Sequence, residues 1–491
     1  MKGDFTRDTF LPMQHFSRVL MQQGRVQLDA DWNEQVAILL HYMQALATDL
    51  IGPQGGPLDN LGFGITINAR ELGLAETEIK ALRQLERGDF WIGRGHYYVE
   101  GILCENDGAV RYTLQERDML TEKLVADKAN AYLLYLDVWE RHIGATEQPD
   151  LREVALGGPD TATRAKIEWQ VKALQFEEGA DGDLKAVTGD DQYAYWSLQI
   201  QKLLDAQAKP ETIVVARQKL AALASTKMLA RTKRDAKPED PCTISPNNHY
   251  RGAENQLYRV EIHRSGEALK DDGSNAATCA TFKWSRDNGA ISFRVAEVEN
   301  GELRLEHLGY DKRNGLDAND WAELVSDNDA LAGTPGLLFQ VRSVSYANQE
   351  VIPKDNFTQA IAAKKGQLVV RRWDQTATGG TKLQTDGSLA LQEDKLVELE
   401  DGVQVQFSSG IDSQGGGYYR SGDYWLIPAR TATGTVSWPG GDDNPTLMPP
   451  NGVAHHYARL ASIAFNPPNL PTIVDLRHGF KPLSQLPVPK A

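Results

Sequence analysis

Cysteine is scarce in this chain, which has three in 491 residues. Cys104, Cys242 and Cys279 lie far apart, and no pair has the Cys-x-x-Cys spacing of a metal site or a redox motif. An odd number of widely spaced cysteines does not form a disulfide framework. We therefore predict three reduced, mostly buried thiols, as in proteins made in the cytosol.

Long apolar stretches are also missing. No run approaches the ~20 consecutive apolar residues that a transmembrane helix needs, and the opening MKGDFTRDTF has no apolar core of a signal peptide. We expect synthesis in the cytoplasm without a signal peptide, and no direct membrane insertion. An extracellular role would then require release by lysis or as part of a particle.

Basic residues are outnumbered, with 52 Lys and Arg against 67 Asp and Glu, so the net charge is −15. The isoelectric point is about 5.2. Nucleic acids and anionic membranes bind basic protein faces. We therefore predict that neither is the main partner.

Catalytic and metal-binding signatures are absent as well. The chain has no Gly-x-Ser-x-Gly, His-Glu-x-x-His, Walker A or Rossmann motif. Residues 29–33 (DADWN) begin like an EF-hand loop, but Glu34 replaces its turn glycine. His455 and His456 are adjacent, so on a strand they point to opposite faces and do not easily share one ion. His478 could join one of them as a further ligand, but one packed and one exposed histidine is the expected arrangement. We predict no catalytic residue, no cofactor and no metal, and therefore no enzyme.

Aromatic pairs in two apparent strands leave one alternative open. Tyr418-Tyr419 and Tyr424-Trp425 could form a sugar-stacking surface, although such residues are more often part of a β-sheet core. In GDYWLIPAR (422–430) apolar groups fall on both faces, which predicts a strand buried on two sides that ends at Pro428.

The most informative feature that is present is an amphipathic stretch near the N-terminus. Its apolar residues alternate in steps of four and three, the a/d pattern of a coiled-coil seam. The seam consists of Trp32, Val36, Leu39, Met43, Leu46 and Leu50. Asp31 and Glu34 resemble a capping box at the start of the helix, and Gly52-Pro53 ends it. The helix must pack on something, either its own β domain or a partner.

Two arginines precede this helix. Arg18 and Arg25 flank a turn at Gly24, close in sequence to Asp29 and Asp31. They could clamp the turn against the helix start through the aspartates, or reach a partner protein. The candidate partner-binding residues are Arg18, Arg25, Trp32, Val36, Leu39, Met43 and Leu46.

Most of the remaining sequence has the pattern of β-strands, with short runs of aromatic and β-branched residues bounded by turn residues. One helix is expected within 74–87, and Asp287-Asn288-Gly289 predicts a β-hairpin. Residues 186–233 differ because they are rich in Ala, Leu, Gln, Lys and Arg. Pro210 divides them into a helical hairpin that looks like a dispensable insertion, with a solvated basic helix face at Lys227–Arg234.

These patterns predict a mainly β, multidomain fold (α+β overall), with an N-terminal amphipathic helix, β-sandwich or barrel-like domains and a helical-hairpin insertion. The predicted division is 1–62 for the docking helix and connector, 63–185 for a first β-rich part, 186–240 for the insertion, 241–400 for a second β-rich part and 401–491 for a C-terminal β-rich region.

Several phrases resemble an uncharacterised bacterial family associated with phage-tail-like contractile injection systems. They are residues 1–35, ATDLIGPQGGP (47–57), YLDVWERH (135–142), 152–172, YRGAENQLYRVEIHR (250–264), FKWSRDNGA (282–290) and GDYWLIPARTATG (422–434). The opening is also similar to the attachment segments of some phage baseplate and tail-fibre proteins, in Gly24-Arg25, Gln27-Leu28 and Asn33-Glu34.

The resemblance implies a structural or accessory component of such a particle, attached at the baseplate, spike or fibre region through its N-terminal segment. Its partners would be protein components of the particle, with homo-oligomerisation open. Two alternatives remain: a payload or toxin carried by the particle, and a surface protein that binds or cleaves carbohydrate. Fold analogy alone does not decide among them.

Overall fold

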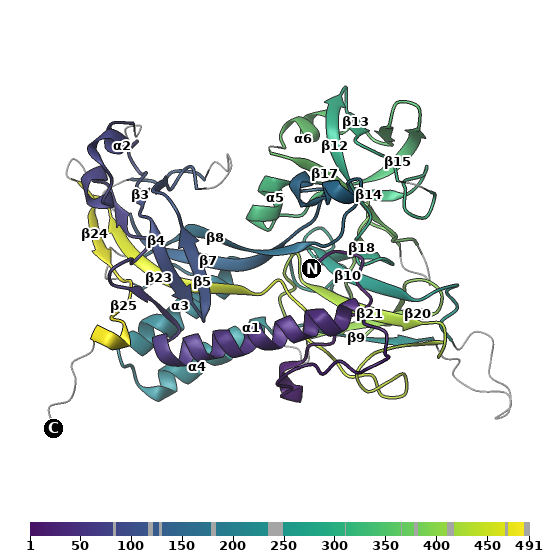
Figure 1. Cartoon of the computed structure of the whole chain (residues 1–491), viewed down its shortest axis with the longest axis horizontal. Helices are drawn as coiled ribbons and strands as arrows, with labels where there is room; N and C mark the ends of the chain where they lie inside the picture. Colours follow the sequence, from purple (N-terminus) through teal and green to yellow (C-terminus); the bar gives the residue numbers. More distant parts are fainter. Residues whose placement is uncertain are drawn as a thin grey trace.

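The computed structural model describes residues 1–81, 85–115, 121–126, 130–177, 183–233, 249–309, 311–364, 366–377, 382–409, 417–466 and 470–485. Strand residues (34%) outnumber helical residues (19%), which confirms the mainly β, multidomain fold. The strands form three units, seen as one lobe on the left of Figure 1 and two stacked on the right. No helix in these ranges is both long and apolar enough to cross a bilayer.

The left-hand lobe contains three sheets. One four-stranded sheet has the order β25 (Gly479–Phe480), β1 (Gln54–Pro57), β4 (Gly95–Val99), β5 (Ile102–Asn106). The other has the order β24 (Thr472–Asp475), β23 (His455–Ala464), β7 (Ala131–Ile143), β8 (Arg164–Gln175). A small third sheet consists of β2 (Ile65–Thr66), β3 (Trp91–Ile92) and β6 (Val110–Arg111).

The sequence of strand β7 is an almost unbroken apolar run because both faces of the strand are buried. Leu134 and Leu136 face the core between the sheets of this lobe. Leu133 and Tyr135 face the opposite way, into a second core with Leu198 of helix α3 (Asp191–Asp205). A strand covered on both faces needs apolar residues at every position rather than at alternate ones.

The second unit lies below the barrel on the right of Figure 1. Its five-stranded sheet has the order β18 (Leu389–Ala390), β11 (Thr281–Ser285), β10 (Gln256–Arg264), β21 (Tyr424–Arg430), β22 (Thr435–Val436). A three-stranded sheet has the order β19 (Val397–Glu398), β20 (Val403–Ser408), β9 (Lys227–Thr232). Both contribute to one core that is rich in tryptophan and tyrosine.

Strand β21 is buried as predicted, but Pro428 does not end it. Trp425 and Ile427 are completely buried, whereas the strand continues to Arg430 with Pro428 opposite Leu257. The Pro428 carbonyl accepts a hydrogen bond from the Ser437 amide at 2.7 Å. Proline removes only a donor, so a strand can pass through it where its carbonyl alone is needed.

The third unit is a closed six-stranded barrel. Its order is β12 (Ser292–Glu299), β13 (Glu302–Leu305), β16 (Glu350–Pro353), β15 (Leu337–Ser345), β14 (Trp321–Ser326), β17 (Leu368–Trp373). Its interior is filled by apolar side chains such as Phe293, Leu324 and Phe339. The short helices are α2 (Glu76–Ala81), α5 (Asp327–Ala332) and α6 (Thr358–Ala362).

The hairpin predicted at Asp287-Asn288-Gly289 is wrong. The turn itself forms, with φ of 50° at Asn288 and 62° at Gly289, but β11 and β12 do not pair. Strand β11 pairs with β10 and β18, and β12 pairs with β13 and β17 of the barrel. The chain therefore passes from one unit to the next at this turn.

The region taken for a dispensable insertion is part of the fold. Helices α3 and α4 (Pro210–Leu223) form the predicted hairpin, but Ala194 and Leu198 of α3 are buried in a core with β7 and β23. The stretch expected to end as a basic helix face is instead strand β9, paired with β20 over Lys227–Thr232. Residues 234–248, Cys242 included, lie outside the described residues.

Candidate functional site at the N-terminal helix

Helix α1 (Asp29–Ile51) is the long helix that crosses the base of the molecule in Figure 1. Ala30 and Ile38 on one side are buried. The backbone of the β4–β5 turn touches the helix, because a Cβ on Gly101 (φ +80°) would lie 2.2 Å from the Gln44 carbonyl oxygen. Only glycine allows this approach, and it fixes which face of the helix is turned to the body.

The predicted seam lies on the opposite face and is open to solvent. The exposed fraction of its side chains runs from 40% at Val36 to 73% at Trp32, and Leu39, Met43, Leu46 and Leu50 lie between these values. The helix does pack on its own β domain, but it does so through the face of Ala30 and Ile38 and leaves the seam uncovered. Six large apolar side chains in one open row are unusual for the surface of a soluble monomer.

The segment before the helix runs back along it and adds to the open apolar area. Met13 and Val26 are 88% and 84% exposed, and Leu20 and Met21 are also exposed. We call the exposed apolar residues of 11–28 together with the α1 seam the N-terminal surface.

Threonines hold this segment against the helix. The Thr6 hydroxyl and amide donate to the Asp29 carboxylate at 2.5 and 2.9 Å, and the Thr9 hydroxyl donates to Glu34 at 2.5 Å. Further on, the Val19 amide donates to Gln35 Oε1 at 2.8 Å. These contacts were not predicted, because nothing local in the sequence pairs a threonine with a carboxylate more than twenty residues away.

The helix start differs from the predicted one. The N-cap is Leu28, and Asp31 Oδ2 accepts from the Leu28 amide at 3.3 Å. Asp31 is therefore the third residue of the helix rather than its cap, and Glu34 is held by Thr9 instead of completing a capping box. Gly52 ends the helix as predicted.

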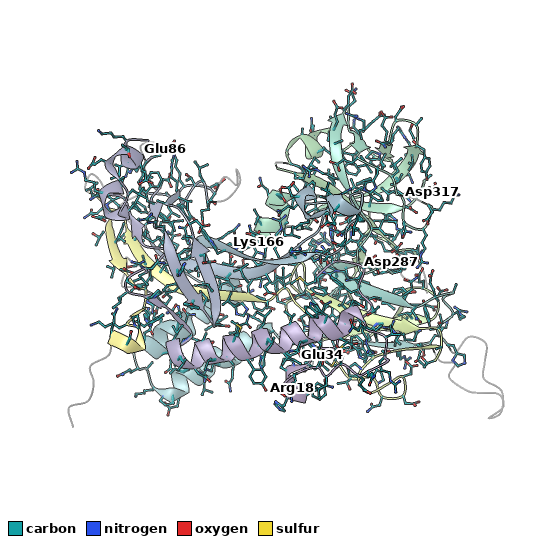
Figure 2. All side chains as sticks on the ribbon, in the orientation of Figure 1. Arg18, Glu34, Glu86, Lys166, Asp287 and Asp317 are labelled. Carbon is teal, nitrogen blue, oxygen red and sulfur yellow. The ribbon has the colours of Figure 1, made fainter. Side chains whose placement is uncertain are left out.

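Arg18 and Arg25 do not clamp the aspartates. Asp29 is bound by Thr6 and Asp31 by the helix start, while both arginines are exposed. Figure 2 places Arg18 beside α1, close to the edge that carries Glu34. Their guanidinium groups form no hydrogen bond or ion pair within the described residues, so they remain available to a partner.

A buried ionic cluster, which the sequence patterns did not predict, lies beside the first residues of the chain. Glu261 of β10 is bound by Arg259 at 2.6 Å, Lys2 at 3.2 Å and Lys283 at 3.3 Å, and Lys283 also reaches Glu323 at 2.6 Å. Burial opposes ionisation of Glu261, but the surrounding cations hold its pKa well below the usual range. The available signal was charge at alternate positions of two otherwise apolar strands, RVEIHR and TFKWS.

The same cluster anchors the first residues of the chain. Arg259 Nη1 donates to the Met1 carbonyl at 2.9 Å, and Asn288 Nδ2 donates to the Gly3 carbonyl at 2.9 Å. The segment before α1 is therefore tied at one end to the second unit and along its length to the helix.

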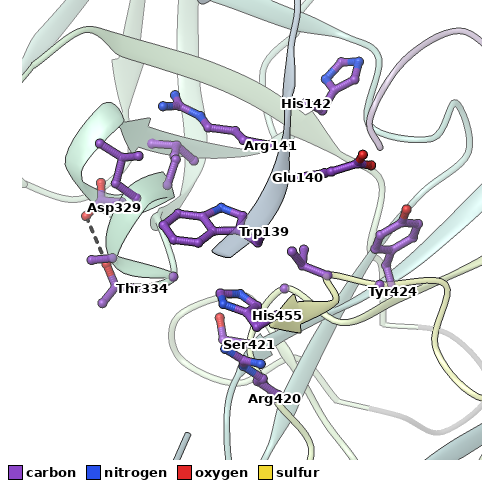
Figure 3. Close-up of a pocket in the computed structure, with 18 of the residues that line it drawn as sticks. Trp139, Glu140, Arg141, His142, Asp329, Thr334, Arg420, Ser421, Tyr424 and His455 are labelled. Atoms are coloured by element: carbon purple, nitrogen blue, oxygen red, sulfur yellow. Dashed lines mark hydrogen bonds between the residues drawn. The ribbon is translucent and has the colours of Figure 1, made fainter. Parts of the chain in front are cut away.

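A cavity of about 480 Å³ lies where the units meet. Trp139 and Arg141 of β7, His455 of β23, and Asp329 and Thr334 beside α5 contribute to its wall (Figure 3). The Trp139 and His455 rings stack at 5.1 Å, and Arg141 binds Asp327 at 2.6 Å.

The chemistry of this cavity centres on a buried carboxylate. Asp137 binds His455 Nδ1 and Lys172 Nζ, both at 2.7 Å. Burial opposes its ionisation, but these two groups hold the pKa of Asp137 well below its usual range. Burial also lowers the pKa of His455, despite Asp137. Within the described ranges no hydroxyl or thiol is hydrogen-bonded to His455.

The histidines considered as metal ligands and the aromatic residues considered as a sugar-binding surface do not come together in one site. His455 binds Asp137, whereas His456 binds Glu100 at 2.7 Å. His478 lies 3.5 Å from Asp205. Across the described part of the chain, no three His, Cys, Asp or Glu side chains are placed to hold one metal ion. Of the aromatic pairs, Tyr419 and Trp425 are fully buried, Tyr424 is nearly so and Tyr418 is half-buried, which confirms the predicted burial of strand β21.

Asp423, beside this cavity, gives a test of the buried charges. Burial, partly offset by Arg420, raises its pKa to about 8. A carboxyl group whose folded-state pKa is raised loses its contribution to stability as the pH rises from its unfolded pKa toward the folded one. The Asp423→Asn variant should therefore melt near the parent at pH 4.5 and a few °C above it at pH 9. Equal melting temperatures at both pH values would contradict this account.

Comparison with known proteins places the chain in a family. A family profile described as "Family of unknown function (DUF6519)" matches residues 1–196 and 204–466. The chain belongs to this family. The match includes α1 and the segment before it, so the N-terminal surface lies within the family's own extent. The search of curated proteins found no match.

Among solved structures, the chain is similar to one titled "Crystal structure of TssK". The sequences are 10% identical, and the comparison covers 82% of this chain and 99% of that chain with a TM-score of 0.17. A score this low does not establish a shared fold.

Proposed function

We propose that the protein is a non-enzymatic structural or accessory component of a contractile, phage-tail-like injection particle, attached through its N-terminal segment. The observation that carries the proposal is the N-terminal surface, a row of solvent-exposed apolar residues with two unpaired arginines beside it. Tryptophan and arginine dominate the binding energy of protein interfaces. The identity of the particle rests on the sequence resemblance described above.

The chemistry of this surface favours a protein partner over a membrane. Amphipathic helices that bind membranes carry Lys or Arg on their polar face. Helix α1 carries Asp29, Asp31, Glu34 and Asp49 and no Lys or Arg. An anionic bilayer would repel it.

The two rival functions gain less support. A sugar-stacking surface needs exposed aromatic rings, and three of the four candidate rings, those of Tyr419, Tyr424 and Trp425, are buried. A payload with its own catalysis needs a nucleophile beside a base, and within the described residues no hydroxyl or thiol is hydrogen-bonded to the Asp137–His455 pair. In this proposal the protein is made in the cytoplasm and leaves the cell with the particle.

The test replaces Arg18 and Arg25 by glutamate and measures the amount of the chain in purified particles. Deleting residues 1–55 is unsuitable, because it removes Lys2 from Glu261 and would disturb the core. We expect occupancy to fall at least ~10-fold, with an unchanged melting temperature.

The matched control is Arg217→Glu with Arg342→Glu, which makes the same charge change at two exposed arginines elsewhere. This control should enter particles normally. Parent-level occupancy of the Arg18/Arg25 variant would refute attachment through this segment.

A further inference from the structure

We infer that the α1 seam is covered by α1 of a second copy of this chain, packed antiparallel about a two-fold axis that passes near residue 41. The inference goes beyond the particle assignment and does not depend on it. It starts from the order of the six exposed seam residues.

The spacing of the seam residues is symmetric about residue 41. Around residue 41, Trp32 and Leu50 are equidistant, as are Val36 and Leu46, and Leu39 and Met43. In an antiparallel pair of helices each a position lies opposite a d position of the partner. The two-fold axis therefore places Trp32 against Leu50, Val36 against Leu46 and Leu39 against Met43, and every layer is apolar.

The residues beside the seam fit the same axis. Leu40 and Tyr42 flank its centre, are exposed, and fall at the same height on the two helices, so they widen the apolar contact. A symmetric contact needs such a self-complementary patch.

Charge favours the antiparallel arrangement over the parallel one. A parallel pair would set the like ends of the two helix dipoles side by side, whereas an antiparallel pair sets the negative end of each helix beside the positive end of its partner. In the antiparallel pair, Asp49 lies near the start of the partner helix, where the unpaired amides attract a carboxylate.

The available area matches what a stable dimer requires. Six large side chains that are 40–73% exposed offer on the order of 800 Å² per chain, about one side of a standard interface. The helix is already folded and held by Gln44 against Gly101. Pairing therefore costs little conformational entropy, unlike the association of isolated peptides. Residues 11–28, with Arg18 and Arg25, stay available for the attachment proposed above.

The first measurement is the molar mass of the purified full-length protein by light scattering after gel filtration, at ~20 µM. We expect twice the 54.3 kDa of one chain. Replacing Leu39 and Met43 by glutamate should raise the dissociation constant at least ~100-fold and give a monomer with the parent's melting temperature. Val214→Glu with Val215→Glu, at exposed positions of α4, is the matched control and should remain dimeric.

Cysteine cross-linking tests the direction of the pair. Trp32 and Leu50 are about 27 Å apart along one helix. The double variant Trp32→Cys/Leu50→Cys should therefore form inter-chain disulfides under mild oxidation, and each single variant should not. The oxidised parent controls for native thiols, of which Cys104 and Cys279 are buried.

Each opposite result overturns the inference. A monomeric parent refutes the dimer, and a dimeric Leu39/Met43 variant refutes the seam as its interface. Cross-linking of Trp32→Cys alone indicates parallel pairing. If particle incorporation fails while the dimer stands, only the proposed function is lost.

Discussion

Replacing Glu261 by glutamine is expected to lower the free energy of unfolding by about 3–5 kcal/mol, because it leaves buried cations without their counter-charge. Glu261 is 3% exposed and lies between Arg259, Lys2 and Lys283. The amide that replaces it cannot neutralise three cations. Denaturation in guanidinium chloride, followed by tryptophan fluorescence, measures the loss.

A matched control and a milder variant keep this prediction decisive. Glu211→Gln, on the exposed face of α4, should change the free energy of unfolding by less than ~0.5 kcal/mol. If Glu261→Gln does not fold, Lys2→Met removes a single cation from the edge of the cluster and should cost less. A Glu261 variant as stable as the control would show that the cluster contributes nothing to stability.

We expect the same cluster to affect the stability of the protein at acid pH. Burial opposes ionisation of Glu323, but Lys283 and His263 lower its pKa to about 2. A carboxylate with a lowered pKa contributes stability above its unfolded value, and this contribution is lost as the pH falls toward the folded value. The Glu323→Gln variant should therefore be less stable than the parent at pH 7. Between about pH 4.5 and pH 2 it should lose less stability than the parent loses.

Replacing Trp425 by alanine is expected to cost about 3–5 kcal/mol through the cavity left in the second unit. Its ring is fully buried, stands 5.7 Å from Phe407, and donates through Nε1 to the Met448 carbonyl at 2.9 Å. Thermal and denaturant unfolding both measure the effect.

The control for this substitution is Tyr346→Ala, which removes an exposed aromatic ring at the end of β15. It should melt within about 1–2 °C of the parent. A Trp425→Ala protein that melts like this control would contradict a structural role for the strand and would reopen the sugar-binding alternative.

The positions of strands could be predicted from the sequence, whereas their pairing could not. Alternation of apolar residues is local, so runs such as 257–264 and 402–407 became strands as expected. Which strand lies beside which depends on contacts between distant residues: β1 pairs with β25, and β7 with β23. The Asp287-Asn288-Gly289 turn shows the limit, since its backbone is right for a hairpin but its two strands enter different units.

The candidate site was predicted in part. The seam on α1 could be predicted, because its apolar residues recur every three or four positions. Its exposure to solvent could not, because exposure depends on how the rest of the chain packs. Lys227–Thr232 was taken for a helix face because lysine and arginine are common on helices, yet Met228 and Ala230 are buried in a sheet. The pairing of Lys2 with Glu261 is invisible in sequence, because charge inside a strand usually signals solvent.

The contacts of the first residues with distant parts of the chain also determine when the molecule can finish folding during translation. Lys2, Gly3 and Thr6 leave the ribosome first, but their partners are Glu261, Asn288 and the Arg430 guanidinium. At ~5–20 residues per second, the last of these follows after roughly 20–90 s. Throughout that interval the first residues lack these partners, and the apolar row of α1 is open to the nascent chains of neighbouring ribosomes. Contacts of such long sequence separation are slow to form, so the N-terminal surface is completed only after most of the chain has been synthesised.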